Sequence, residues 1–379
     1  MAGALKQRFN DDLLLEEEDQ KRAKERFSSP LFAVLYFEEL CTFFKKYEKR
    51  AKEAKQRRGY VGAFAILAGM LALGGAAAAP VYHHLGAPWP AILVVFSVFL
   101  GITSVVIGLF GVGSTKHKQF WLLNRLMTER LRQFHLQTLV RRIPSVLEAM
   151  ESNEGRTRYI HARKEWLASF KARYKNHLQS RLRGVLDDIA EDDVWLHDAE
   201  LSHVRFDEAD AWSAPVSIGA HLTELFRAYA ELRFDHQIQY ADFKLDRSGV
   251  FFASAVRQND LLRGLTLGCI LIVLAAHILI GLSVVPNFDS APENPWPEVV
   301  VLWSVIFVLG ARAFEEGLQP TREIERYSRY GAAMQRLKTL FERTQDPGEK
   351  IRIMCETERL VYQEMRGFLK THDEARFLI

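Results

Sequence analysis

Hydrophobic and polar positions are sharply separated along this chain of 379 residues. Four stretches are almost wholly apolar, and the segments around them carry nearly all of the charge. The first two stretches contain no Asp, Glu, Lys or Arg, and the third contains one histidine, His277. An apolar stretch of about 20 residues forms a helix that crosses roughly 30 Å of hydrocarbon. The four stretches occupy residues 59–80, 90–113, 264–286 and 297–310.

The fourth stretch is the shortest and spans a bilayer only if Arg312 reaches the interface. A re-entrant or buried helix is the alternative for this stretch. The pattern predicts an all-α membrane protein with four transmembrane helices arranged as two hairpins, and with long cytoplasmic helices that form a helical body. The predicted segments are N-terminal helices at 1–58, hairpin 1 at 59–113, a helical domain at 114–262, hairpin 2 at 263–314 and C-terminal helices at 315–379.

Charge around the apolar stretches predicts the orientation. Residues 45–58, just before the first stretch, hold eight basic residues against two glutamates. The predicted loop of the second hairpin instead carries Asp289, Glu293 and Glu298, with no basic residue. Because basic flanks stay on the cytoplasmic side, both chain ends and the middle segment are expected there.

A basic amphipathic helix is expected between the two hairpins. Apolar residues recur every four positions from Trp166 and Phe170 onward, which places them on one helix face. The other face is basic and is a candidate surface for a nucleotide or another phosphate ligand; the alternatives are a solvated face, a lipid-facing face or pairing with acids. The candidate ligands of phosphate are Arg163, Lys164, Lys171, Arg173, Lys175, Arg181 and Arg183.

An acidic segment follows this helix, with ten Asp and Glu between Asp187 and Asp210. It lacks fixed ligand spacing for a metal, so charge matching to the basic helix is the simpler interpretation, and no metal or other cofactor is expected. The chain has no phosphate loop, nucleophile elbow, HExxH or CxxC motif. His197 and Glu200 are interpreted as surface groups, and an enzyme is not predicted. The stretch around Pro215 is the expected break between the two halves.

Conduction through such a protein would require several copies, since four helices are too few to enclose a pore. A homo-oligomer such as a tetramer is therefore expected. The second apolar stretch carries Ser97, Gly101, Ser104 and Gly108 at a spacing that serves either close helix packing or pore lining.

Ionisable groups at or near the apolar stretches are the remaining pore candidates. His277 has either a functional role or a hydrogen bond to a backbone carbonyl. Arg312 marks the inner mouth of a pore or extends from the span end to the interface. Asp289, Glu293 and Glu298 repeated around an axis would concentrate cations at an entrance.

Trp121, Arg125, Glu129 and Leu131 follow the first hairpin at a W-x-x-x-R-x-x-x-E-x-L spacing. Before the second hairpin stand Glu231, Arg233, Gln237, Tyr240, Lys244 and Arg247, and after it stand Glu356 and Glu364. At these positions the helices that flank the hairpins resemble those of the SLATT family and its relative DUF4231, as two apparent tandem copies. The first copy lacks the Arg-x-x-x-Gln lead and the second lacks the Trp, so partial analogy between the two halves is the alternative to a duplication.

This resemblance implies a pore-forming effector of a bacterial anti-phage defence system, located in the inner membrane. It also implies a nucleotide or oligonucleotide signal, made by a partner nucleotidyltransferase, that gates the pore. The alternative is a non-conducting membrane scaffold that recruits cytoplasmic partners.

Overall fold

The computed structural model describes residues 11–82, 89–108, 115–180, 219–248, 254–283 and 296–374. Every regular element in these ranges is a helix, and no strand occurs in them. The predicted all-α class is therefore confirmed for the described chain. In chain order the helices are η1 (Asp11–Leu13), α1 (Glu17–Arg26), α2 (Ser29–Leu35), α3 (Glu38–Ala77), α4 (Ala79–Tyr82), α5 (Trp89–Ile107), α6 (Thr115–Arg141), α7 (Ile143–Glu151), α8 (Asn153–Ser180), α9 (Ala220–Tyr229), η5 (Ala230–Asp235), α10 (His236–Leu245), α11 (Ala255–Ser283), α12 (Trp296–Leu318), α13 (Pro320–Arg343) and α14 (Pro347–Glu374).

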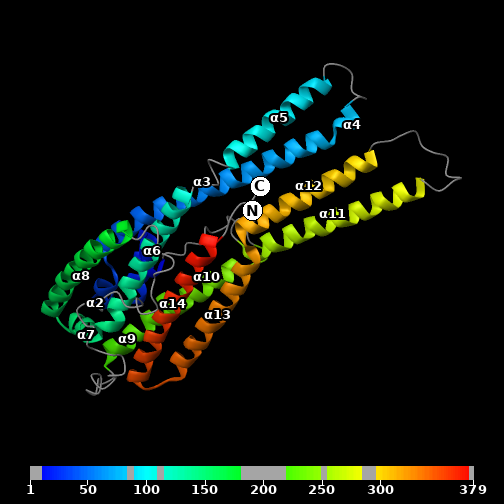
Figure 1. Ribbon diagram of the computed structural model, residues 1–379. Helices are drawn as coiled ribbons and strands as arrows, with labels where there is room; N and C mark the ends of the chain where they lie inside the picture. The colour runs from blue at the N-terminus through cyan, green and yellow to red at the C-terminus, as the bar shows by residue number, and fades with distance from the viewer. Residues whose placement is uncertain are drawn as a thin grey trace. The chain divides into compact units, whose positions relative to one another are not determined.

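Two compact units share the chain, and each is assembled from separate segments (Figure 1). Unit 1 combines residues 1–52, 121–243 and 325–373. Unit 2 combines residues 53–120, 244–324 and 374–379. Each unit is held together by contacts between distant parts of the chain, and the five consecutive segments expected from the sequence remain a prediction.

Local sequence signals set several helix starts. The Ser28 hydroxyl accepts a hydrogen bond from the Leu31 amide at 3.4 Å, and a proline occupies the first turn of α2. Before α14, the Asp346 carboxylate accepts a hydrogen bond from the Glu349 amide at 2.7 Å. These side chains satisfy amides that have no partner inside the helix, which fixes where each helix begins.

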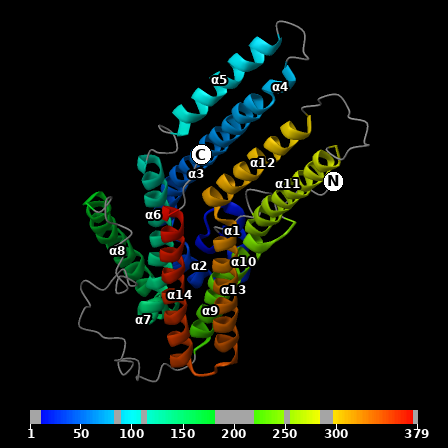
Figure 2. The same ribbon diagram turned by 45° about the vertical axis from the view of Figure 1, so that its right-hand side comes forward.

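Unit 1 is a helical body with an extensive core. Helix α7 packs along α8, α2 contacts both of them, and the short helix η1 lies on η5. Helices α13 and α14 run side by side in both views (Figures 1 and 2). The fully buried core residues come from many helices, and they include Phe44, Leu131, Phe234, Met354 and Tyr362.

The apolar helices of unit 2 pack through small residues. Ser104 of α5 donates a hydrogen bond to the Ala65 carbonyl of α3 at 2.9 Å, and Trp303 of α12 donates to the Gly74 carbonyl at 2.9 Å. A Cβ added at Gly75 would overlap the Ser97 hydroxyl, so α3 and α5 approach closely there. Helices α11 and α12 lie side by side in both views (Figure 2).

The outside of unit 2 is apolar, unlike the surface of a water-soluble protein. Phe99 on α5 is 63% exposed and Leu279 on α11 is 62% exposed, among many other large apolar side chains. Within the described residues, four helical stretches are long and apolar enough to cross a membrane, namely Glu38–Ala77, Trp89–Ile107, Ala255–Gly281 and Trp296–Arg343. The fourth apolar stretch thus lies in a helix of sufficient length, and the composition is that of a membrane protein.

Candidate functional site: a buried network of charges

The basic residues expected to form one exposed strip on α8 have different surroundings in the structure. Arg163 is buried and donates hydrogen bonds to three carbonyls at the end of α2, those of Ala33 at 3.3 Å, Val34 at 2.8 Å and Tyr36 at 2.8 Å. Burial lowers the pKa of Arg163. This guanidinium therefore attaches α8 to α2 and does not face solvent.

The other basic residues of α8 have different surroundings. Lys164 forms an ion pair with Glu39 at 2.6 Å, and the Lys171 amine lies 4.5 Å from the centre of the Phe43 ring. Arg173 and Lys175 belong to α8, but their side chains lie outside the description. Arg181, Arg183, the acidic segment and the break at Pro215 lie outside the described residues.

The buried face of α8 differs from the predicted stripe. It runs through Tyr159, Arg163, Leu167 and Phe170, whereas Trp166 is only half-buried. Phe170 contacts Phe134 with ring centres 5.1 Å apart, as the stripe predicted. The difference arises because an arginine that bonds carbonyls occupies a core position, which a pattern of apolar residues does not reveal.

The small-residue face of α5 contacts α3 within one copy of the protein. Ser104 is 1% exposed, Ser97 lies against Gly75, and a Cβ at Gly101 would lie 3.6 Å from Ala72. Of the two uses expected for this spacing, close packing is the one present in this copy.

Unlike the buried Ser104, His277 is exposed on the surface of α11. Its Nδ1 lies 2.8 Å from the Val273 carbonyl of the same helix. Arg312 forms an ion pair with Glu315 at 2.8 Å, and its side chain is 66% exposed. Glu298 is exposed at the start of α12, whereas Asp289 and Glu293 lie outside the described residues.

A buried cluster of charges lies in unit 1, around the π-helix η5. Arg233 of η5 and Glu358 of α14 are both fully buried and are joined by two hydrogen bonds of 2.8 and 2.6 Å. The Tyr229 hydroxyl donates to the same carboxylate at 2.9 Å. Burial opposes the charge on Arg233, but the Glu358 carboxylate raises the pKa of Arg233 overall. A π-helix is rare and occurs often at functional sites.

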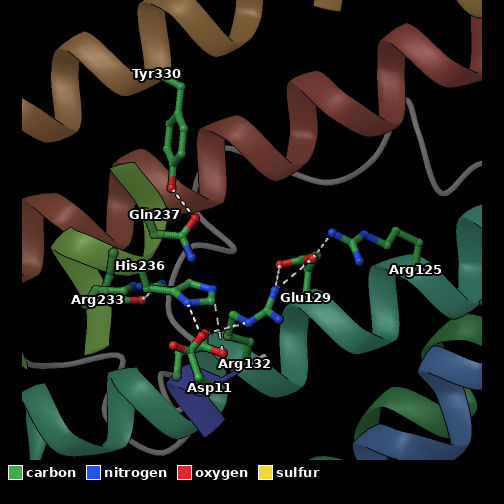
Figure 3. A network of polar contacts seen from close by, with 10 residues as sticks. Asp11, Arg125, Glu129, Arg132, Arg233, His236, Gln237 and Tyr330 are labelled. Atoms are coloured by element: carbon green, nitrogen blue, oxygen red, sulfur yellow. Dashed lines mark hydrogen bonds and ion pairs between the residues drawn. The ribbon is translucent and has the colours of Figure 1, made fainter. Parts of the chain in front are cut away.

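A second chain of ion pairs runs from α6 to the N-terminal segment (Figure 3). Arg125 pairs with Glu129 at 2.5 Å, and Glu129 pairs with Arg132 at 3.1 Å. The Arg132 Nε lies 2.7 Å from the carboxylate of Asp12, whose side chain is fully buried. Burial alone would raise the pKa of Glu129, but the arginines around it, with Arg125 first, lower it overall.

His236 extends this network. Its Nδ1 lies 2.7 Å from Asp11 Oδ1, and its Nε2 lies 3.8 Å from Asp12. The pKa of Asp11 is lowered overall, since the bond and the charge of His236 outweigh burial. Beside it, Gln237 accepts a hydrogen bond from the Tyr330 hydroxyl at 2.8 Å (Figure 3). The network therefore joins η1, α6, α10 and α13.

Several residues that carry the resemblance to the SLATT family also form side-chain contacts with other helices. Trp121 packs on the rings of Phe368 and His372, and Glu364 forms an ion pair with Arg326. Tyr240 lies 3.4 Å from Tyr327, measured between hydroxyl oxygens. The sequence interpretation missed four central members of the network, which are Asp11, Asp12, His236 and Glu358. The acidic pair directly before three leucines was the one available signal for the first two.

The described residues contain no cluster of His, Cys, Asp and Glu that could hold a metal ion. His197 and Glu200 lie outside the described residues. Comparisons with protein-family models, with curated proteins and with solved structures found no match.

Proposed function

We propose that this protein is an oligomeric transmembrane channel or pore-forming effector of a bacterial anti-phage defence system, gated by a nucleotide or oligonucleotide bound to its helical body. The system and the signal are taken from the resemblance to the SLATT family. The observation that carries the membrane part of the proposal is the exposure of His277 on an apolar helix.

An imidazole is costly in hydrocarbon and is normally found facing protein or water. In a single copy, His277 lies on the outside of α11 among exposed apolar side chains. Its described contact uses only Nδ1, within the same helix. One turn later, Gly281 has open space where a Cβ would be. A second copy of the protein, or an aqueous path between copies, would give His277 a polar environment.

The proposed orientation places unit 1 in the cytoplasm of the bacterial cell, beneath the inner membrane. The basic residues before the first apolar stretch support this side, as do the acidic residues near the predicted outer loops. The proposed nucleotide surface on α8 now comprises Lys164, Lys171, Arg173, Lys175, Arg181 and Arg183, without the buried Arg163.

A non-conducting scaffold is the second candidate, and one observation favours it. The hydroxyl of Ser104 donates a hydrogen bond to the carbonyl of Ala65 in the same copy of the protein. Helix α5 therefore offers mainly apolar side chains to its surroundings, such as Val95 and Phe99. In a channel, α11 is then the better candidate to line the path.

Native mass spectrometry of the protein in lipid nanodiscs tests the oligomer on which the proposal depends. We expect wild type to be oligomeric, and His277→Leu and Gly281→Leu to shift it toward single copies. Gly264→Leu is the matched control, because this glycine also faces open space on α11 but lies on a different side of the helix. A wild-type protein present only as single copies, or an oligomer unchanged by both variants, would contradict the argument from His277.

A further inference from the structure

The N-terminal segment of the described chain is inserted into unit 1 in an unusual way. Leu13, Leu14 and Leu15 are all nearly fully buried, as is Asp12. Leu14 has a φ of 53°, a left-handed conformation that is strained for a residue with a side chain. The fold maintains this strain to keep the acidic pair and the leucines in place.

The acidic pair faces a guanidinium and an imidazole. Asp12 lies on the guanidinium of Arg132, and Asp11 lies on the imidazole of His236. Asp12 pairs with Arg132 by charge, but neither of its buried carboxylate oxygens accepts a well-aligned hydrogen bond within the described chain. A buried carboxylate without well-aligned hydrogen bonds stabilises the fold less than one that forms such bonds with its charged neighbours.

Asp12 is the nearest carboxylate partner of Arg132, at 2.7 Å. Without Asp12, Arg132 would keep Glu129 at 3.1 Å and the more distant Glu48. One Nη of Arg233 is buried and has no hydrogen bond in the described structure. The side chain of Asp11 is 43% exposed, so solvent reaches the cluster at this residue.

We propose that Arg132 and His236 form a binding site for a diphosphate group, and that Asp11 and Asp12 occupy this site as a built-in substitute. Two adjacent carboxylates, one on a guanidinium and one on an imidazole nitrogen, resemble the two anionic groups of a diphosphate, and guanidinium groups bind phosphate oxygens well. Binding of the ligand displaces η1 and withdraws Leu13 from the core. This inference rests on the proposed function for the role of the ligand, and it moves the ligand from α8 to the network.

The chain contains its own reporter for displacement of the segment. Cys41 is buried, and its thiol donates a hydrogen bond to the Leu13 carbonyl at 3.3 Å. The alkylation rate of Cys41, resolved from that of the other cysteines by mass spectrometry, therefore measures release of η1 in the full-length protein in detergent.

We expect inorganic pyrophosphate to raise the rate of Cys41 alkylation several-fold above that in potassium chloride of equal ionic strength. Asp11→Asn with Asp12→Asn should raise the basal rate and lower the pyrophosphate concentration for half-maximal effect by about tenfold, because a larger fraction is competent to bind. Asp19→Asn, at another buried aspartate, is the control and should change neither value. Arg132→Lys should weaken the response.

An alkylation rate unaffected by pyrophosphate in both wild type and the double variant would overturn the proposal. An equal response to malonate would overturn its assignment to phosphate. The alkylation measurement needs no membrane current, so it can support the diphosphate site even if the protein conducts no ions. A protein that conducts ions could likewise show no alkylation response to pyrophosphate.

Discussion

Removal of the charge on Glu358 should destabilise unit 1 strongly. Glu358→Gln keeps the shape of the side chain and an acceptor for the Tyr229 hydroxyl, but leaves Arg233, which is fully buried, without its charged partner. Breaking a buried pair on one side costs about 3–5 kcal/mol. At about 2–4 °C per kcal/mol for a domain of this size, the melting temperature should fall by about 10 °C.

Circular dichroism during heating, on the full-length protein in detergent, is the assay. Glu356→Gln is the matched control, because this residue is exposed on the same helix and should change stability by less than about 0.5 kcal/mol. Replacing both Arg233 and Glu358 by Met and Leu should restore much of the loss, since an apolar pair carries no buried charge. A melting temperature of Glu358→Gln equal to that of the control would refute the reasoning.

Two further predictions concern stability. Burial and the charges of Arg163 and Arg233 lower the pKa of His135 to about 3 in the folded protein. As pH falls below about 6.5, His135 is therefore protonated in the unfolded state but stays neutral in the folded state. The free energy of unfolding should consequently drop by about 2 kcal/mol near pH 5. Denaturation between pH 5 and 7 should show a smaller drop for His135→Gln; an identical drop would exclude His135 as its source. Gly155→Ala should cost about 1–3 kcal/mol in thermal melts, because its Cβ would overlap the Glu148 carbonyl, whereas Gly348→Ala meets only a movable carboxylate. Equal melting temperatures for the two variants would contradict this packing.

The apolar helices could be predicted from sequence because hydrocarbon imposes a simple requirement on length and polarity. The same pattern did not decide whether Ser104 packs against another helix or lines a pore, since small residues occur in both places. Contact with Ala65, 39 residues earlier, decides the matter for one copy. The two sides of the membrane and the hairpin arrangement remain predictions.

The network was only half visible in the sequence. The resemblance to the SLATT family singled out Arg125 and Glu129, which are four residues apart on one helix and form an ion pair. Arg233 was also singled out, but its partner Glu358 is 125 residues away and could not be chosen from the other acids of α14. Long-range pairs of this kind depend on helix packing, which periodicity does not specify.

Current across a planar bilayer containing the purified protein tests the central claim most directly. We predict discrete ion currents for wild type in the presence of pyrophosphate, more frequent openings for Asp11→Asn with Asp12→Asn, and loss or altered conductance for His277→Leu. A bilayer that remains silent with both wild type and the double variant, with and without pyrophosphate and with the protein shown to be inserted, would contradict a channel opened by release of η1 and favour the scaffold.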